Sequence, residues 1–395
     1  MSIEITIRKD LPLGVWRGMG GAITEATAYN FAKLSPAKQK QFLDAYYGKN
    51  GLDYRWGRIP IGSCDFCLEP FEYTKRSDLS DFSIAHDEKY LLPMLRKVNK
   101  MKMLTFVAAP WSPPSCLKFL RMRRFGGKLK PWYYKTYAEY LRKWLNAYKK
   151  EGITIDYLSP QNEPFARQIW ESCRYSFRAQ RKLAKYLETL GPKLLLWDHN
   201  KQHLAKVADE LLPKTSAAGL CYHWYDGTHP EQMWAVCQKY PNAMLVSSEM
   251  CCGFSPYDEQ EWQKDARLYL RELLTDINCG TCAWIDWNML LDYHGGPSYC
   301  KNYVKSPVIL SEAGDDFILT PIYYALKKFA KLFPAGAEIL RCECDSENVV
   351  AVARKTKTDY AVVAVNLGEE PVQIKIGGKT GELPVLAPTQ FLFDD

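Results

Sequence analysis

Eight short apolar runs alternate with longer amphipathic stretches through most of the chain. The runs cover residues 16–22, 54–59, 103–109, 154–159, 193–197, 218–223, 243–248 and 281–287. The helix-like stretches between them include residues 36–47, 87–99, 132–149, 177–190, 203–212, 231–239 and 257–275. Such alternation is typical of a parallel sheet with helical crossovers. Eight strand and helix units predict an α/β fold, namely a (β/α)8 TIM barrel with enlarged loops.

The pattern changes after residues 320–332, which are predicted to form the last helix of the barrel. Short strands separated by Gly, Asp, Asn and Pro turns are expected at residues 339–344, 349–354, 360–366, 372–376 and 390–393. Residues 3–8 read as a further strand that has no place in the barrel. We therefore predict a small β-sandwich formed from the C-terminal segment plus this N-terminal strand. The predicted units are residues 1–12 (the N-terminal strand), 13–333 (the barrel) and 334–395 (the C-terminal sandwich).

Composition excludes several classes of protein. No run approaches the ~20 consecutive apolar residues of a transmembrane helix, so no transmembrane segment is expected. The first residues, Met-Ser-Ile-Glu, lack the order of a signal peptide, which predicts a cytoplasmic protein, or a secreted one if a leader has been removed. Thirteen cysteines, an odd number, fit reduced thiols better than a disulfide framework. The net charge of +7 is too weak to predict a nucleic-acid partner, and nothing indicates an oligomeric state.

Two glutamates stand at the predicted ends of barrel strands, where the active sites of such barrels lie. Glu163 follows the fourth run, within the triplet Asn-Glu-Pro, and Glu249 follows the seventh. Two carboxylates on separate strands suit glycoside hydrolysis, because one protonates the leaving oxygen and the other meets the positive charge at the anomeric carbon. Taken singly, each glutamate is also explained as a solvated loop residue or as half of an ion pair.

Longer motifs, in a fixed order, carry a resemblance that spans nearly the whole chain. They are GMGGA at 18–22, RIPIGSCDF at 58–66, APWSPP at 109–114, NEP at 162–164, HWY at 223–225, SE at 248–249, WIDWN at 284–288 and GGP at 295–297, followed by Asn302, Ser306 and Pro307. In these motifs the chain resembles glycoside hydrolase family 30, and most closely its branch of acid glucosylceramidases and β-1,6-glucanases.

The resemblance implies a retaining glycosidase in which Glu163 is the acid/base and Glu249 is the nucleophile. Such a mechanism needs the two carboxyls about 5 to 5.5 Å apart. Glu163 is then expected to hold a proton in a drier pocket, while Glu249 stays ionised. Arg58 and Tyr225 are expected to keep Glu249 charged, and Arg58 is also explained, compatibly, as a structural partner of any inward-facing acid.

The resemblance also implies how a sugar is held. Asn162 is expected to donate to the 2-hydroxyl, a bond that strengthens in the transition state. Asp65 and Trp111 are expected to bind the far hydroxyls of a glucose ring, Trp287 to form an apolar floor, and His223 to line the same pocket. A carboxylate that accepts from two hydroxyls favours glucose over xylose, which lacks the 6-hydroxyl.

The predicted function is therefore cleavage of β-glucosides, either glycolipid or glucan, without a cofactor. The same mechanism on a β-xyloside, β-fucoside or β-galactoside is the first alternative, and a non-hydrolytic glycan-binding protein is the second. No metal is expected, because the CxxC pairs Cys64/Cys67 and Cys279/Cys282 are far apart and no His accompanies them at ligand spacing. The basic loop at residues 118–130 is interpreted as a solvated face, or as a contact for an anionic aglycone, lipid headgroup or acidic glycan.

Overall fold

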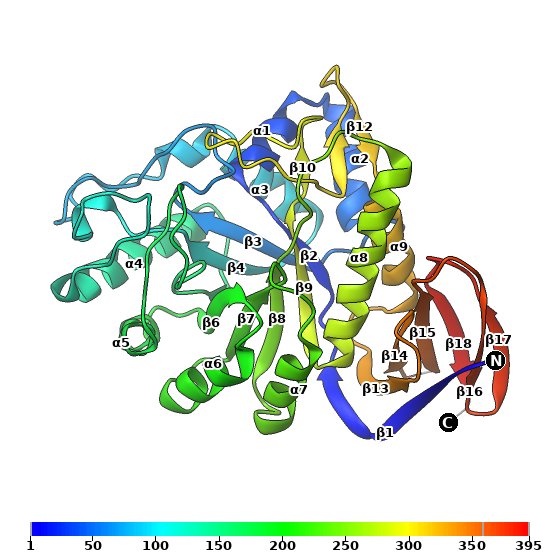
Figure 1. The fold of residues 1–395 in the computed structure, drawn as a ribbon. Helices are drawn as coiled ribbons and strands as arrows, with labels where there is room; N and C mark the ends of the chain where they lie inside the picture. The colour runs from blue at the N-terminus through cyan, green and yellow to red at the C-terminus, as the bar shows by residue number, and fades with distance from the viewer. Residues whose placement is uncertain (1, 358, 394–395) are drawn as a thin grey trace.

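The computed structural model describes residues 2–357 and 359–393 (Figure 1). In this part of the chain eight parallel strands, β2 to β9, close into a barrel in chain order, which confirms the predicted TIM barrel. One barrel strand lies within or beside each of the eight apolar runs. The strands are β2 (Met19–Ala22), β3 (Trp56–Ile61), β4 (Thr105–Pro110), β5 (Tyr157–Leu158), β6 (Lys193–Asn200), β7 (Gly219–His223), β8 (Met244–Glu249) and β9 (Thr281–Asn288).

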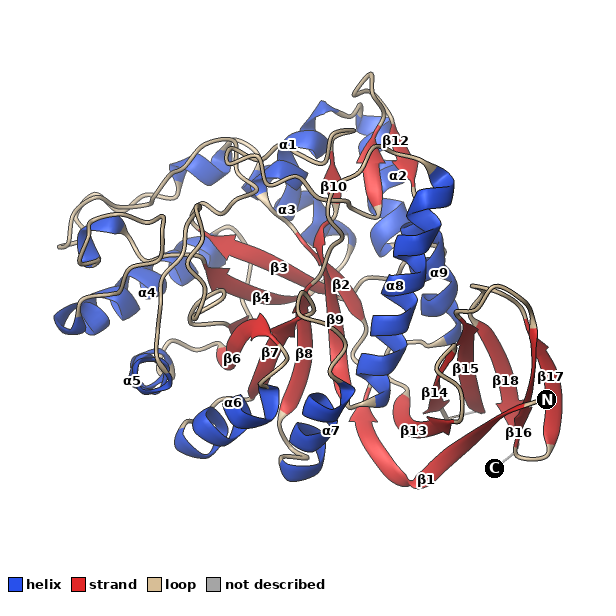
Figure 2. Ribbon diagram, viewed as in Figure 1, coloured by secondary structure: helices blue, strands red, loops and turns tan. Residues whose placement is uncertain are grey.

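Helices surround the barrel on its outer face (Figure 2). They are α1 (Glu25–Lys33), α2 (Pro36–Tyr47), α3 (Leu91–Met101), α4 (Tyr134–Lys150), α5 (Phe177–Leu187), α6 (Leu204–Leu211), α7 (Pro230–Lys239), α8 (Glu259–Asn278) and α9 (Pro321–Leu332). Helix α2 begins where its sequence signals predict, because Ser35 accepts a hydrogen bond from the amide of Lys38 and Pro36 needs no partner there. Sequence reasoning missed α1. No helix of the described residues has the length and apolarity to cross a membrane.

The predicted C-terminal strands and the N-terminal strand join in one sheet beside the barrel (Figure 1). Its order in the described chain is β17-β16-β1-β13-β14-β15-β18. The sheet folds over its own apolar core, so that the ring of Phe391 on one edge strand lies against Gly381 on the other. The strands are β1 (Ile3–Val15), β13 (Glu338–Cys344), β14 (Val349–Lys355), β15 (Tyr360–Asn366), β16 (Val372–Ile376), β17 (Lys379–Leu383) and β18 (Thr389–Phe393).

A further small sheet was not predicted. It is formed by β10 (Leu290–Leu291), β11 (Val308–Leu310) and β12 (Phe317–Leu319), in the long connection between β9 and α9. This connection also carries Asn302 back over the barrel, where its amide reaches Asp65. The enlarged loop therefore contributes to the rim of the barrel mouth.

The inside of the barrel is closed at its N-terminal end by apolar side chains. Trp56 and Tyr157 stack there with ring centroids 5.4 Å apart, and they pack with residues such as Val107, Val246 and Ile285. The buried polar cluster around Arg58 lies toward the opposite end, where the strands finish.

Helix α8 joins the barrel to the C-terminal sheet. The side chain of Asn278 exchanges hydrogen bonds with the backbone of Cys342, and Arg267 donates to the carbonyl of Leu367. Strand β1 continues from the sheet toward the barrel, since its last residue, Val15, still pairs with β13. The division at residues 12 and 333 stays a prediction.

Candidate active site

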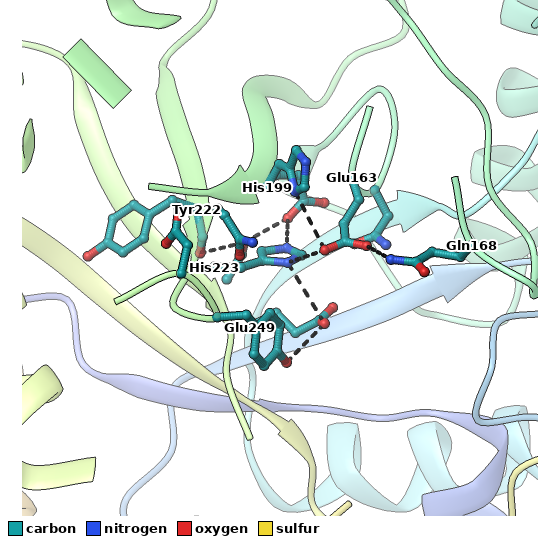
Figure 3. Close-up of polar contacts among 12 residues, drawn as sticks. Glu163, Gln168, His199, Tyr222, His223 and Glu249 are labelled. Carbon is teal, nitrogen blue, oxygen red and sulfur yellow. Dashed lines mark hydrogen bonds and ion pairs between the residues drawn. The ribbon is translucent and has the colours of Figure 1, made fainter. Parts of the chain in front are cut away.

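Two glutamates from different barrel strands converge on one histidine nitrogen (Figure 3). Glu163 Oε1 lies 3.6 Å from His223 Nδ1, and Glu249 Oε1 lies 3.8 Å from the same atom. Glu163 follows β5, Glu249 ends β8, and His223 ends β7 between them in the chain. The two Oε1 atoms are therefore no farther apart than the sum of these distances. That limit includes the about 5 to 5.5 Å used by retaining glycosidases.

Glu249 is held by the two residues predicted to support it. Its Oε2 accepts a hydrogen bond from Arg58, and its Oε1 accepts one from the hydroxyl of Tyr225 at 3.1 Å. Glu249 is only 7% exposed, and both partners donate to its carboxyl oxygens. A guanidinium and a hydroxyl therefore fix the two oxygens of this side chain in place.

Arg58 organises most of the predicted sugar-binding residues. Besides Glu249, its guanidinium donates to Asn162 Oδ1 at 2.7 Å and lies 4.8 Å from the ring centroid of Trp111 and 5.3 Å from that of Trp287. The two tryptophans stack on each other at 5.3 Å and 20°. Because arginine only donates, it fixes the carbonyl side of the Asn162 amide and leaves the NH2 side for donation to a ligand.

Asp65 lies in the loop after β3. Asn302 donates to its Oδ2 at 2.8 Å. Burial, together with the negative charge of Glu249, raises the pKa of Asp65 to about 8. The structure therefore brings all nine residues predicted for the site to the C-terminal end of the barrel.

Asp198 is a site residue that sequence reasoning missed. It ends the regular part of β6, is fully buried, and accepts hydrogen bonds from Arg58 at 3.0 Å and from Ser248 at 2.6 Å. Its Oδ1 also lies 3.1 Å from His223 Nε2. Burial favours the neutral acid, but Arg58 and His223 outweigh it and hold the pKa of Asp198 well below its usual range. Asp198 thus fixes the orientation of the arginine and the histidine together.

Two further missed residues contact Glu163. His199 Nδ1 lies 3.5 Å from its Oε1, and Gln168 donates to its Oε2 at 3.3 Å. Glu163 has a left-handed backbone, with φ of 47°, and its amide donates to the carbonyl of Asp198 at 2.8 Å. The turn after β5 is therefore anchored on β6, which aims the carboxylate at the histidines.

The prediction that Glu163 holds a proton is wrong for this structure. Burial favours its neutral form, but the nearby imidazoles of His199 and His223, 3.5 and 3.6 Å from its Oε1, outweigh burial and lower the pKa of Glu163 well below its usual range. Burial also opposes the charge of His223, yet Glu249, Asp198 and Glu163 raise its pKa to about 9. The two pKa shifts thus have opposite directions: the setting of Glu163 favours its charged carboxylate, and the setting of His223 favours its protonated imidazole.

His223 gives the stability of the fold a predictable dependence on pH. Its pKa of about 9 exceeds the ordinary value of about 6.5. The stability it contributes is therefore complete below about pH 6.5 and is lost as the pH rises through about 9. We expect the free energy of unfolding to fall by up to about 3 kcal/mol across this range, and the His223→Gln variant to show a flatter profile. Denaturant titrations at several pH values measure both slopes, and equal slopes would contradict the assignment.

The basic loop after β4 is only partly the solvated face that was expected. The ammonium of Lys118 is buried and donates to the carbonyls of Gly126 and Ser172 at 2.6 and 2.7 Å, and burial lowers its pKa to about 8. The guanidinium of Arg123 donates to Ser63 Oγ at 2.5 Å. These two cations hold the loop in place, since they satisfy backbone groups rather than facing solvent.

Cys64 and Cys67 lie 4.0 Å apart between sulfurs, with both side chains buried. Among residues 2–357 and 359–393 no group of three or more His, Cys, Asp or Glu side chains is arranged to hold a metal ion.

Known proteins resemble this chain over almost its full length. The sequence model described as "Glycosyl hydrolase family 30 TIM-barrel domain" matches residues 16–333. Lysosomal acid glucosylceramidase of Mus musculus is 30% identical over 412 residues, which cover 94% of this chain and 79% of that protein.

Solved structures show the same likeness. The structure of SrfJ from Salmonella typhimurium has a TM-score of 0.93 at 26% identity and covers 100% of this chain and 93% of its own. The endo-beta1,6-glucanase BT3312 has a TM-score of 0.83 at 25% identity and covers 97% of this chain and 91% of its own.

Proposed function

The chain belongs to glycosyl hydrolase family 30 and is a glycosidase, and from this premise we propose that it cleaves β-glucosides with retention of configuration. The observation that carries the proposal is the convergence of Glu163 and Glu249 on His223 Nδ1, at 3.6 and 3.8 Å. Two carboxyls this close to one atom can flank a single anomeric carbon. Inverting enzymes separate their carboxyls by about 6.5 to 9.5 Å, a range that the upper limit of this separation also reaches, so the support for retention comes from the family to which the chain belongs.

In the first step a carboxylate oxygen of Glu249 attacks the anomeric carbon. The bond from that carbon to the leaving oxygen breaks, and Glu163 gives that oxygen a proton. The proton reaches Glu163 from the imidazolium of His223, which lies beside it. The products are a glucosyl ester of Glu249 and a free alcohol.

In the second step the roles of Glu163 reverse. Its carboxylate takes a proton from water while the water oxygen attacks the anomeric carbon, and Glu249 leaves as a carboxylate. Glu163 then returns the proton to the neutral imidazole of His223, which restores the starting state. Arg58 and Tyr225 then stabilise the charge that returns to Glu249, since both donate to it.

Glucose is the sugar that the pocket supports best. Asp65 is a buried acid whose Oδ2 is already occupied by Asn302, so that a sugar hydroxyl pair is a natural partner for the rest of the carboxyl group. Relatives with this fold are named for glucosylceramide and β-1,6-glucan, which both present glucose. We propose a β-glucoside with a lipid or glucan aglycone, and the β-xyloside, β-fucoside and β-galactoside stay as alternatives.

Asp65→Asn is expected to lower kcat/KM for an aryl β-glucoside by about 10²-fold, because hydrogen bonds to a buried carboxyl group are lost. The aryl β-xyloside is expected to lose much less, since it lacks the 6-hydroxyl. A side-by-side panel of aryl β-glucoside, β-xyloside, β-galactoside and β-fucoside measures the preference of wild type and variant.

Glu347→Gln, an exposed change on the C-terminal sheet, serves as the matched control for that panel. If wild type has a higher kcat/KM for the xyloside than for the glucoside, the proposed sugar is xylose instead of glucose. Binding of the sugars without release of product, by wild type, would instead favour a glycan-binding protein.

A further inference from the structure

Six large apolar side chains are exposed together at the rim of the barrel mouth. We call them the rim surface: Phe119, Leu120, Met122, Phe125, Trp132 and Ile169. Their exposed fractions range from 40% for Phe125 to 66% for Trp132. Single exposed apolar residues are common on proteins, but a group of this kind marks a site of interaction.

The rim surface is one continuous structure built from two loops. The amide of Phe125 donates to the carbonyl of Gln168 at 2.9 Å, and the guanidinium of Arg124 donates to the carbonyl of Ile169 at 2.7 Å. The rings of Phe119 and Trp132 meet edge to face at 5.8 Å. These hydrogen bonds connect the loop after β4 to the loop after β5. The buried ammonium of Lys118 also connects them, because it donates to the carbonyl of Gly126 in the first loop and to that of Ser172 in the second.

Cations surround these apolar side chains, and acids are absent from this stretch of sequence. No aspartate or glutamate occurs between Glu88 and Glu139. Arg121 and Lys128 are exposed, while Arg124 and Lys130 are half-buried. The rim surface therefore presents apolar side chains within a positively charged border.

This combination fits an anionic lipid bilayer better than other occupants. Tryptophan, phenylalanine and leucine enter the headgroup boundary of a bilayer, and each nearby Lys or Arg adds about 1 kcal/mol with anionic lipid. Nucleic acids and sugars stack on flat rings, and Leu120, Met122 and Ile169 offer them no such face. Every charged side chain between residues 118 and 132 is basic, which suits negatively charged headgroups rather than a mixed-charge protein.

The rim surface adjoins the candidate acid/base. Gln168, whose carbonyl accepts from Phe125, donates through its side chain to Glu163 at 3.3 Å. A bilayer in contact with the rim surface would therefore face the barrel mouth. The sugar of a glycolipid in that bilayer could then enter the site without leaving the membrane.

We propose that the rim surface docks the protein on anionic phospholipid bilayers and so presents membrane-embedded glycolipids to the site. The docking itself depends only on the rim surface, whereas the delivery of glycolipid rests on the proposed function.

Co-sedimentation of the full chain with vesicles tests the docking. Wild type is expected to bind vesicles of phosphatidylserine and phosphatidylcholine and to bind phosphatidylcholine alone about tenfold or more weakly. Leu120→Ser with Trp132→Ser, and separately Arg121→Gln with Lys128→Gln, are each expected to weaken binding about tenfold or more. Thermal midpoints check that each variant is folded.

Met103→Ser with Lys100→Gln is the matched control. Met103 is 91% exposed and precedes β4, so the pair removes an apolar side chain and a cation at the opposite end of the barrel. This variant is expected to bind vesicles as wild type does. The proposal is overturned if wild type binds vesicles equally well with and without phosphatidylserine, or if the rim variants bind vesicles as strongly as wild type. It is also overturned if light scattering shows that the rim surface joins two copies of the chain.

The docking and the proposed function can fail separately. Hydrolysis of an aryl β-glucoside in free solution reports the function alone, and the rim variants are expected to keep it. Vesicle binding without aryl glucoside hydrolysis would leave docking standing and remove the function. Hydrolysis of the aryl glucoside without vesicle binding would keep the proposed function and remove the docking.

Discussion

Glu249→Gln is expected to lower kcat for an aryl β-glucoside by about 10⁴-fold or more, in the range that loss of a nucleophile costs other hydrolases. The amide has nearly the same shape and cannot form the glycosyl ester. It also removes the negative charge that Arg58 and Tyr225 face, so that the positive charge developing on the sugar loses its partner. Sugar binding is expected to persist, because Asp65, Trp111 and Trp287 are unchanged.

Initial rates with the aryl glucoside measure this loss, and mass spectrometry identifies the covalent step. A 2-fluoro glucoside that slows the second step is expected to add one sugar to wild type, on the peptide that contains Glu249, and none to the variant. Glu231→Gln, an exposed change at the start of α7, is the matched control. Unchanged turnover by Glu249→Gln, or a sugar attached elsewhere, would remove Glu249 from its proposed role.

The loss of kcat/KM caused by Glu163→Gln is expected to depend on the leaving group of the substrate. An alkyl β-glucoside, which needs a proton on its leaving oxygen, is expected to lose about 10² to 10⁴-fold in kcat/KM. A dinitrophenyl β-glucoside leaves as a stable anion and is expected to lose far less in the first step. The difference arises because only the poor leaving group depends on protonation.

Comparison of kcat/KM for the two substrates, in wild type and variant, measures this selectivity. A loss of equal size on both would mean that Glu163 shapes the site without transferring a proton. The thermal midpoint of the variant must also be measured to check that it is folded, because the carboxylate of Glu163 lies beside the imidazoles of His199 and His223.

The barrel could be predicted from sequence because each strand lies in or beside a short, mostly apolar run. Elements that lack such a signal were missed. Helix α1 begins soon after β2 and buries polar residues such as Glu25, Thr27 and Asn30, so that it has no clear polar face. Strand β17 has Gly377 and Gly378 before it and Gly381 within it, a composition more typical of a turn.

The candidate site was predictable where a residue ends a strand within a recognisable motif. Asp198 and His199 also end a strand, but β6 bends there, with φ of 80° at Trp197 and 52° at Asp198. Regular alternation along a strand does not show which residue of a bent segment faces the barrel axis. The protonation of Glu163 was wrong because it depends on distances to His199 and His223, which no local pattern encodes.

The place of β1 in the C-terminal sheet has a consequence for how the protein is made. This strand lies between β13 and β16, yet it leaves the ribosome before the whole barrel is synthesised. At about 5 to 20 residues per second, it waits of the order of tens of seconds for its neighbours. During that time its backbone groups and the apolar side chains of Ile3, Ile5 and Ile7 stay without their final partners. In a nascent chain β1 therefore stays unpaired until β13 and β16 have been synthesised.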